Sequence, residues 1–459
     1  MLDPLKEVFE EGLLEGGEEE EIEEVEEKIP TKRFGYSKAL PIYQDEFDVL
    51  NLYSSKEPIK KYKFSNKSGL LIEVMNFGAT ILTVRMPDKF GNTADVLLGF
   101  ATVQEYYEQN CKFGAMIGRT SNIIEDANFQ HGNELHFLRK NSDAHHRDGG
   151  VMSFDKVIWK SYVEKATNTL IMTYLSENQE EGYPGNLLTR ISMKLSDENE
   201  FIITINAVCD ESTPVDIAPR LFFNLAGHGA GEEKIKDHKM QINADMYIMQ
   251  DSRGIPTGRL KHVNQTYFDL RTPRPFHFAL DRIRGGGYKH TFCLNKSHRY
   301  DAQGVVFAGR LEEPESGRYV EIWTDAPGLY FYTANNFPKP ECPEEEVQAE
   351  EPIMSTISQP KPMSKSESRI GGLFGKHDKQ YFRHGAVALS PQGYPNSVNM
   401  PTFPSSIIQP HKAFQRKIIY QFGVSSKIMA HPKAIKSKEN VERSRKSLDH
   451  SQIVEEEKE

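Results

Sequence analysis

Residues 69–88, "GLLIEVMNFGATILTVRMPD", decide the fold class of this chain. The stretch holds two runs rich in Leu, Ile, Val and Thr, and Asn76-Phe77-Gly78 separates them. Branched aliphatic side chains favour the pleated backbone of a strand, whereas Asn and Gly favour the turn between two strands. We therefore predict two neighbouring β-strands joined by a tight turn.

The same pattern recurs along the chain on the C-terminal side of this stretch. Alternating apolar and polar residues, with turn residues at spacings of about ten, occur in "KVIWKSYVEK" (156–165), "TLIMTYLSE" (169–177), "LLTRISMKLSDENEFIITINAVCD" (187–210) and "HKMQINADMYIMQD" (238–251). Long helical periodicity is nearly absent. Many short strands of this kind are typical of an all-β fold, and we predict a large antiparallel β-sandwich or super-sandwich.

Three segments lack this pattern. They are an acidic leader (1–45), an internal insertion rich in Pro, Glu and Ser (338–372) and a charged tail (423–459). Their like charges repel, and they hold too little apolar surface to offset chain entropy, so we expect disordered extensions. The β-sandwich domain is then expected over 46–422. An acidic leader is most often only a solvated segment, and the alternative is that the leader or the tail docks on a protein partner.

Charge and cysteine content narrow the class of protein. The net charge is −10, yet residues 1–27 alone carry thirteen acidic residues and one Lys, so the remainder carries +2. A nearly neutral body without a basic, aromatic-interleaved stripe argues against nucleic-acid binding. No apolar run is long enough to span a membrane, and the acidic leader is not a signal peptide. Cys111, Cys209, Cys293 and Cys342 form no CxxC pair, so we expect free thiols in the cytoplasm.

Ten sequence motifs follow one another along the chain. They are "FGATILTVRMPDKFGNTADVLLGF" (77–100), "KFGAMIGRTSNII" (112–124), "GGVMSFDKVIW" (149–159), "EEGYPGNL" (180–187), "FFNLAGHG" (222–229), "QINADMYIMQDSRGIPTGRL" (241–260), "GGGYKHTFCL" (285–294), "EEPESGR" (312–318), "APGLYFYTANNF" (326–337) and "PNSVNMPTFPSSIIQP" (395–410). Together they resemble the galactose mutarotases, the aldose 1-epimerases, over roughly residues 50–422. The resemblance implies a galactose mutarotase-like β-sandwich.

The resemblance also implies a chemistry. Mutarotases open and reclose a hexose ring so that its α and β anomers exchange, without a metal or organic cofactor. One group must take the proton from the anomeric hydroxyl while another protonates the ring oxygen, and both need a pKa near neutrality. The family uses a glutamate as the base and a histidine as the acid. A second histidine, an aspartate, a glutamine and an Asn-Arg pair hold the sugar hydroxyls.

This chain departs from the family at most of those positions. The sugar-binding asparagine is kept as Asn122, but the arginine that follows it in the family is replaced by Ile123. The other sugar-binding positions carry Asp148 for the histidine, Lys289 for the aspartate and Tyr330 for the glutamine. Asn122, Asp148, Lys289 and Tyr330 are therefore the candidate substrate-binding residues.

The two catalytic positions have changed as well: Arg220 stands where the family has its acid histidine, and Ser390 stands at the position of the base glutamate. A guanidinium has a pKa above ~12 and cannot cycle a proton. A serine hydroxyl is no base unless a neighbouring group activates it. Losing both groups costs on the order of 10⁴–10⁸ in rate. The leading hypothesis is therefore a catalytically inactive or severely impaired family member, a pseudoenzyme that still binds a carbohydrate.

Two alternatives remain open at this point. An active aldose 1-epimerase could use rearranged groups, for which His146, Asp148 and His384 are the candidates. A non-catalytic scaffold could instead have its cleft closed by side chains. If the fold is right, Arg220, Asp148 and Lys289 converge on one cavity, either as an ion pair of Asp148 with one of the two cations or as a site for a hexose or an anionic sugar.

A histidine cluster raises the question of a metal site. His145 and His146 are adjacent, and His131 and His136 lie upstream of them. Their spacing fits no standard zinc pattern, and the segment "AHHRDGG" is polar, so we expect solvated histidines and no metal. Tyr330 and Tyr332 alternate along one expected strand, which would place both rings on the same face.

Overall fold

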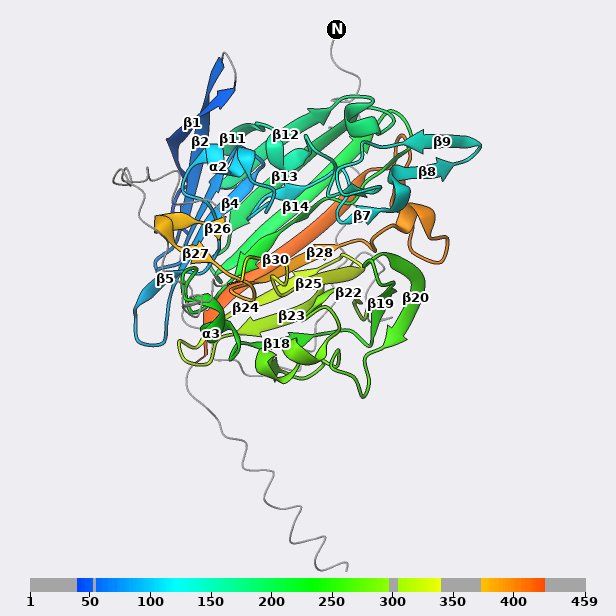
Figure 1. Ribbon diagram of the computed structural model, residues 1–459. Helices are drawn as coiled ribbons and strands as arrows, with labels where there is room; N and C mark the ends of the chain where they lie inside the picture. Colours follow the sequence, from blue (N-terminus) through cyan, green and yellow to red (C-terminus); the bar gives the residue numbers. More distant parts are fainter. Residues whose placement is uncertain (1–38, 53–54, 297–303, 340–372, 426–459) are drawn as a thin grey trace, which may run out of the picture. The chain divides into compact units, whose positions relative to one another are not determined.

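The computed structural model describes residues 39–52, 55–296, 304–339 and 373–425. One compact unit extends to Val424, and its main sheets are seen in Figure 1. Most of the leader, the insertion and the tail lie outside the described residues, so the disorder expected for them stays a prediction. Strands extend past both expected ends of the domain, since β1 begins at Tyr43, which pairs with Lys63, and β30 ends at Val424, which pairs with Arg318.

A five-stranded antiparallel sheet forms the N-terminal part of this unit. In order it contains β1 (Tyr43–Leu52), β2 (Ser55–Ser65), β3 (Leu71–Met75), β4 (Thr80–Pro87) and β5 (Thr93–Asp95). The pair β3–β4 confirms the two strands predicted from residues 69–88. Gly78, in the turn between them, has φ +64°, and a Cβ there would lie 2.7 Å from the carbonyl oxygen of Asp155, which explains the glycine.

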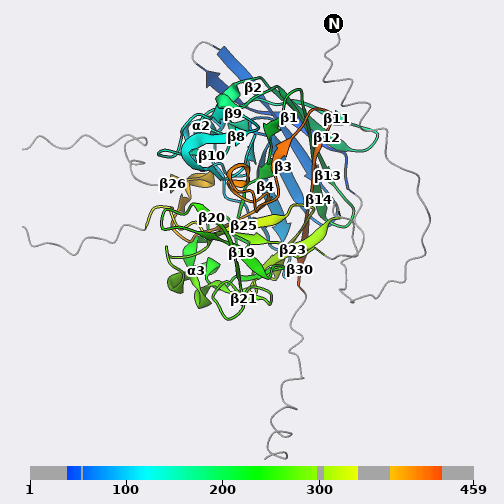
Figure 2. The same cartoon turned by 90° about the vertical axis from the view of Figure 1, so that its right-hand side faces the viewer.

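A nine-stranded antiparallel sheet is the largest layer. Its order is β11 (Lys160–Glu164), β12 (Thr169–Ser176), β13 (Leu187–Leu195), β14 (Glu200–Cys209), β30 (Phe414–Val424), β24 (Arg318–Thr324), β23 (Val306–Glu312), β18 (Lys239–Ile242) and β21 (Arg274–Pro275). Figure 2 shows the five-stranded sheet, in blue, beside β13 and β14. Side chains alternate between buried and half-buried along β13, as expected for a strand with one face on the core.

A six-stranded antiparallel sheet carries the positions of functional interest. Its order is β17 (Leu221–Phe223), β28 (Val387–Gln392), β25 (Gly328–Tyr332), β22 (Lys289–Cys293), β19 (Met246–Gln250) and β20 (Pro256–His262). One face points into the main hydrophobic core through Leu221, Phe331 and Leu389. The opposite face supplies Phe222, Tyr330, Tyr332 and Ala388 to a second apolar cluster.

Short elements complete the unit. Besides several 3-10 turns, these elements are α2 (Val103–Glu108), α3 (Gly231–Ile235) and the two-stranded ladders β6 (Met116–Ile117) with β16 (Ala218–Pro219), β7 (Ile123–Ile124) with β10 (His146–Arg147), β8 (Asn128–His131) with β9 (Glu134–Phe137), β15 (Thr213–Pro214) with β29 (Ile407–Ile408), and β26 (Leu373–Phe374) with β27 (Gln380–Tyr381). Every named strand pair in the described ranges is antiparallel, so the all-β, antiparallel β-sandwich prediction is confirmed.

Candidate functional site

One face of the six-stranded sheet gathers the candidate residues in two cross-strand rows. Ser390 on β28 pairs with Tyr330 on β25, which pairs with Thr291 on β22. In the adjacent row Phe222, Ala388, Tyr332 and Lys289 pair in succession across β17, β28, β25 and β22. Directly paired residues of antiparallel strands share a face, so these side chains point to one side of the sheet. Tyr330 and Tyr332 therefore share a face, as predicted, and their rings stack with centroids 6.3 Å apart.

Arg220, directly before β17, forms a two-pronged ion pair with Asp148. Its Nη1 lies 2.5 Å from Oδ2 and its Nη2 lies 2.7 Å from Oδ1 of the carboxylate. Both side chains are almost buried, with exposed fractions of 12% and 6%. Burial alone would raise the pKa of Asp148, but Arg220 outweighs it and holds that pKa at about 2. A carboxylate held so firmly in its charged form is a weak proton acceptor.

The local backbone fixes this carboxylate in place. Asp148 follows β10 with φ +52°, in the left-handed region that Asp tolerates better than most residues. Its N–H donates to the carbonyl oxygen of Asn122 at 2.7 Å, and its Oδ1 accepts the N–H of Asn122 at 2.8 Å. The two candidate residues are therefore joined by a pair of hydrogen bonds that orient the Asp148 side chain toward Arg220.

Ser390 is fully buried and its hydroxyl is already committed. The Oγ donates a hydrogen bond of 2.8 Å to the carbonyl oxygen of Pro219. No imidazole or carboxylate in the described part of the chain hydrogen-bonds to this hydroxyl. Activation of a serine requires such a base, so the arrangement provides no activated serine.

Lys289 and Arg147 add two further positive charges next to the Arg220–Asp148 pair. Burial lowers the pKa of Lys289, and Arg147 and Arg220 lower it further while Asp148 opposes them. Within the described ranges, the Lys289 ammonium and the Arg147 guanidinium form no hydrogen bond or salt bridge with another residue. Arg147 was missed by sequence reasoning, although it directly precedes Asp148 in "HHRDGG".

The ring of Tyr330 packs against the guanidinium of Arg220. The ring is buried, and the central carbon of the guanidinium lies 5.7 Å from its centroid. This distance is within the range of a cation–π contact. Burial raises the pKa of the Tyr330 hydroxyl, with Arg220 and Arg147 acting in the opposite direction, so the hydroxyl stays protonated near neutral pH. The site thus combines the ring of Tyr330, the ion pair between Arg220 and Asp148, and the ammonium group of Lys289.

Comparison with known proteins shows the family of the chain. The family model for aldose 1-epimerase matches residues 60–421. The chain belongs to the aldose 1-epimerase family. It is 32% identical to mouse galactose mutarotase over 364 residues, which cover 79% of this chain and 94% of that protein. Identity to the Escherichia coli aldose 1-epimerase is 27% over 372 residues, covering 80% of this chain and 96% of that enzyme.

Solved structures show the same fold. A GalM/aldose epimerase homologue from C. elegans matches with a TM-score of 0.65 and 21% identity, covering 78% of this chain and 97% of that one. Galactose 1-epimerase from Lactobacillus acidophilus matches with a TM-score of 0.64 and 21% identity, covering 84% of this chain and all of that one. At this level of identity the structures support the fold, the galactose mutarotase-like β-sandwich.

The two histidines proposed for a rearranged catalyst in this aldose 1-epimerase family member, His146 and His384, are both engaged in hydrogen bonds. The expectation of solvated histidines is wrong for His145 and His146, which are buried. His146 is fully buried, with Nδ1 2.7 Å from the Arg139 carbonyl oxygen and Nε2 2.7 Å from the Tyr183 hydroxyl. His384 has Nδ1 2.8 Å from the Thr333 carbonyl oxygen, and its Nε2 accepts from Arg383. Burial lowers the pKa of both rings. Neither ring therefore has a free nitrogen that could transfer a proton near Asp148.

Two general features of the described residues complete the description of the site. No group of three or more His, Cys, Asp and Glu side chains in the described ranges is arranged to hold a metal ion. No described helix has the length and apolar character needed to cross a membrane.

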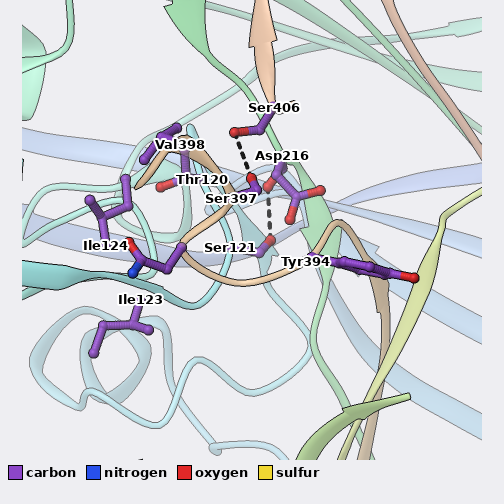
Figure 3. Close-up of a pocket in the computed structure, with 10 residues that line it drawn as sticks. Thr120, Ser121, Ile123, Ile124, Asp216, Tyr394, Ser397, Val398 and Ser406 are labelled. Carbon is purple, nitrogen blue, oxygen red and sulfur yellow. Dashed lines mark hydrogen bonds between the residues drawn. The ribbon is translucent and has the colours of Figure 1, made fainter. Parts of the chain in front are cut away.

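Figure 3 shows residues that line a small cavity, to which none of the charged residues described above contributes. Its lining includes Ile123, at the position of the family's arginine, and Asp216, but none of Arg220, Lys289 or Tyr330. Ser121 donates to the backbone oxygen of Asp216, and Asp216 forms a salt bridge of 2.5 Å with Arg416. Because neither of the family's two catalytic positions, Arg220 and Ser390, lines this cavity, we take the sheet face as the candidate site.

Proposed function

We propose that this chain is a member of the aldose 1-epimerase family that binds a carbohydrate, a hexose or an anionic sugar, without exchanging its anomers. The observation that carries the proposal is the ion pair between Arg220 and Asp148 at the family's acid position. Proton transfer to the ring oxygen needs a group that can give up a proton near neutral pH. A guanidinium whose pKa is raised further by Asp148 cannot do so, although burial acts against that rise.

The base position supports the same proposal. Ser390 donates its proton to the Pro219 carbonyl and has no activating partner among the described residues. The alternative of an active aldose 1-epimerase would require His146, Asp148 or His384 to take over the proton transfers. Asp148 is bound by Arg220, and both histidines have each ring nitrogen in a hydrogen bond. We therefore favour a pseudoenzyme over a rearranged catalyst.

Polarimetry on freshly dissolved α-galactose and α-glucose tests this proposal. The wild-type protein should leave the rate of mutarotation within about twofold of buffer, since both proton-transfer groups are missing. Acceleration that is lost in the Asp148→Asn variant would overturn the proposal and establish the rearranged catalyst.

Restoring the family residues gives a gain-of-function test. The double variant Arg220→His with Ser390→Glu should accelerate mutarotation about tenfold or more over the wild-type protein, because it returns an acid and a base to the sheet face. Arg220→His alone is the matched control and should remain inactive. A folded double variant with no acceleration would instead support the scaffold alternative, in which side chains close the cleft.

Location and partners extend the proposal. Cys111, Cys209 and Cys293 are free cysteines in the structure, which supports our proposal of a cytoplasmic location. Docking of a protein partner on the leader or the tail remains a prediction, because those segments lie almost entirely outside the described residues. Fractionation of cells followed by immunodetection of the protein checks the location directly, and recovery in a membrane or secreted fraction would contradict it.

A further inference from the structure

The candidate face carries more positive than negative charge. Arg147, Arg220 and Lys289 all act on one another or on Asp148. The second carboxylate that acts on Arg220, Asp155, is already paired with Lys112. Arg220 donates hydrogen bonds to both oxygens of the Asp148 carboxylate, and the backbone N–H of Asn122 donates to one of them as well. Asp148 therefore compensates Arg220 and leaves the charges of Arg147 and Lys289 without a bonded counter-charge.

The position of Arg147 follows from a short ladder. Strand β10 pairs with β7 so that Arg147 lies directly across from Ile123. Ile123 occupies the position at which the resemblance to the family implies a sugar-contacting arginine. Ile123 itself is buried and lines the separate small cavity. Arg147 is half-buried and directly precedes Asp148, and its charge acts on the Asp148 carboxylate.

Lys289 reaches the same region from the sheet. It pairs with Tyr332 on β25, whose ring stacks on that of Tyr330. The Arg220 guanidinium lies 5.7 Å from the centroid of the Tyr330 ring. Burial raises the pKa of Tyr330 and of Tyr332, and the charge of Arg147 opposes that rise at both hydroxyls. Lys289 is half-buried, and its ammonium has no hydrogen-bond partner among the described residues.

Arg220 itself retains an unused donor. Its Nε is buried and has no hydrogen-bond partner in the described structure, although both terminal nitrogens bond to Asp148. A buried donor without a partner costs free energy, and so does a desolvated cation without a counter-charge. Arg318 and Arg416 also have a buried Nε without a partner among the described residues, so this feature alone does not indicate a ligand. The two cations left unpaired in the described structure do, because an anion with several acceptor oxygens would supply their counter-charge.

We propose that this face binds a sugar derivative bearing an oxyanion, a phosphate or a carboxylate, which Arg147 and Lys289 contact directly. The proposal rests on the carbohydrate-binding function proposed above and specifies its ligand class. Guanidinium and ammonium groups form short, charge-assisted hydrogen bonds with such oxyanions. A neutral hexose would leave both cations uncompensated, so the face discriminates against it.

Isothermal titration calorimetry of the full chain tests this proposal with four probes: galactose 6-phosphate, galacturonate, galactose and inorganic phosphate. At least one charged sugar should bind about tenfold or more tightly than galactose and than inorganic phosphate. Its affinity should fall when the salt concentration is raised from about 0.05 M to about 0.3 M, because salt screens partly exposed charges. The phosphate and the carboxylate probes show which oxyanion the face prefers.

Charge-removing variants locate the binding site. Lys289→Met and Arg147→Met should each weaken the charged sugar about tenfold or more, whereas Lys289→Arg should retain binding. Lys289→Arg keeps the positive charge. A loss of sugar binding in Lys289→Met but not in Lys289→Arg is therefore assigned to the missing charge and not to misfolding. Lys261→Met is the matched control, because Lys261 is exposed on β20 and takes no part in the charged cluster. It should bind like the wild-type protein.

Each contrary outcome has a distinct meaning. Equal binding of galactose and the charged sugars, or full binding by Lys289→Met and Arg147→Met, overturns the oxyanion proposal and leaves carbohydrate binding intact. Inorganic phosphate that binds as tightly as every charged sugar overturns it too, since no sugar is then recognised. Absence of binding by all four probes overturns both this inference and the proposed carbohydrate-binding function. Accelerated mutarotation by the wild-type protein overturns the proposed lack of catalysis alone.

Discussion

At the scale of single residues, Arg220 changes both the chemistry and the electrostatics of the site. In the family an imidazole that can gain and lose a proton is expected at this position. The guanidinium keeps its charge, and that charge requires a buried partner. Asp148 provides it with two short contacts of 2.5 and 2.7 Å. The two substitutions are therefore physically linked, since either alone would leave a buried charge unpaired.

A double-mutant cycle should reveal this linkage. Arg220→Met leaves the Asp148 carboxylate buried and should lower the free energy of unfolding by about 3–5 kcal/mol. Adding Asp148→Asn removes the stranded charge and should recover a large part of that loss. Urea denaturation of the wild-type protein, both single variants and the double variant measures the coupling. Strictly additive effects would show that the pair contributes no coupling energy.

The ion pair also predicts a pH dependence. The pKa of Asp148 is depressed to about 2 from an ordinary value of 3.8 by Arg220, which outweighs the opposing effect of burial. A depressed carboxyl pKa stabilises the fold above its unfolded value, and this contribution is lost as the pH falls from about 4 to about 2. The wild-type protein should lose about 2 kcal/mol more over this range than the Arg220→Met, Asp148→Asn variant. Parallel stability curves for the two proteins would contradict this assignment.

At the scale of elements, the turn after β10 sets the positions of Arg147 and Asp148. Arg147 ends β10, Asp148 follows it with a positive φ, and Gly149 continues the turn with φ +82°. A Cβ on Gly149 would lie 1.9 Å from the carbonyl oxygen of Gly118, so the backbones approach too closely for any side chain. The turn is therefore required by the packing of two backbone segments, and it determines where Arg147 and Asp148 point.

Substitution of this glycine tests the close approach. Gly149→Ala should destabilise the protein by at least about 3 kcal/mol more than Gly285→Ala, because the added methyl group overlaps backbone atoms. Gly285 is the matched control, since its φ is +91° and no atom lies within 4 Å of its Cβ position. The control should cost only about 1–2 kcal/mol for the strained backbone. Equal losses in thermal or urea unfolding would mean that the backbone at Gly149 relaxes freely.

At the scale of the whole compact unit, strand β30 joins distant parts of the chain. It lies between β14 and β24 in the nine-stranded sheet, so residues 414–424 pair with residues 200–207 on one side and 318–324 on the other. Ile418 is fully buried and pairs with Ile203 and Thr324. The large sheet is completed only when this strand, which comes last in sequence among the named strands, is in place.

A proline in the middle of β30 should therefore prevent folding. Ile418→Pro removes a backbone donor and a core side chain from a strand paired on both sides, at a cost of about 3 kcal/mol or more from the backbone alone. Val424→Pro is the control, because Val424 ends the strand and pairs with Arg318 on β24. Soluble yield and far-UV circular dichroism distinguish the two variants. A well-folded Ile418→Pro protein would show that the sheet is stable without β30 pairing.

Much of this architecture could be predicted from residue patterns. Alternating apolar residues, as along β13, and the Asn76-Phe77-Gly78 turn specify strands and a reversal locally, because strand geometry depends on neighbouring residues. The order of the ten motifs was sufficient to indicate the family, which the family model matching residues 60–421 confirms. The identities of Arg220 and Ser390 indicated missing proton-transfer groups, since the chemistry of a guanidinium or a hydroxyl belongs to the side chain itself.

The pairing of those side chains was decided only by the tertiary structure. From the sequence alone, Asp148 could have paired with either Arg220 or Lys289, and Arg147 gave no sign of its place opposite Ile123. Strand register and the positive φ of Asp148 settle both points, because they set which side chains meet across segments far apart in the chain. The sequence by itself determined which chemical groups this protein has. The fold determined which charge is neutralised and which two cations are left without a bonded counter-charge.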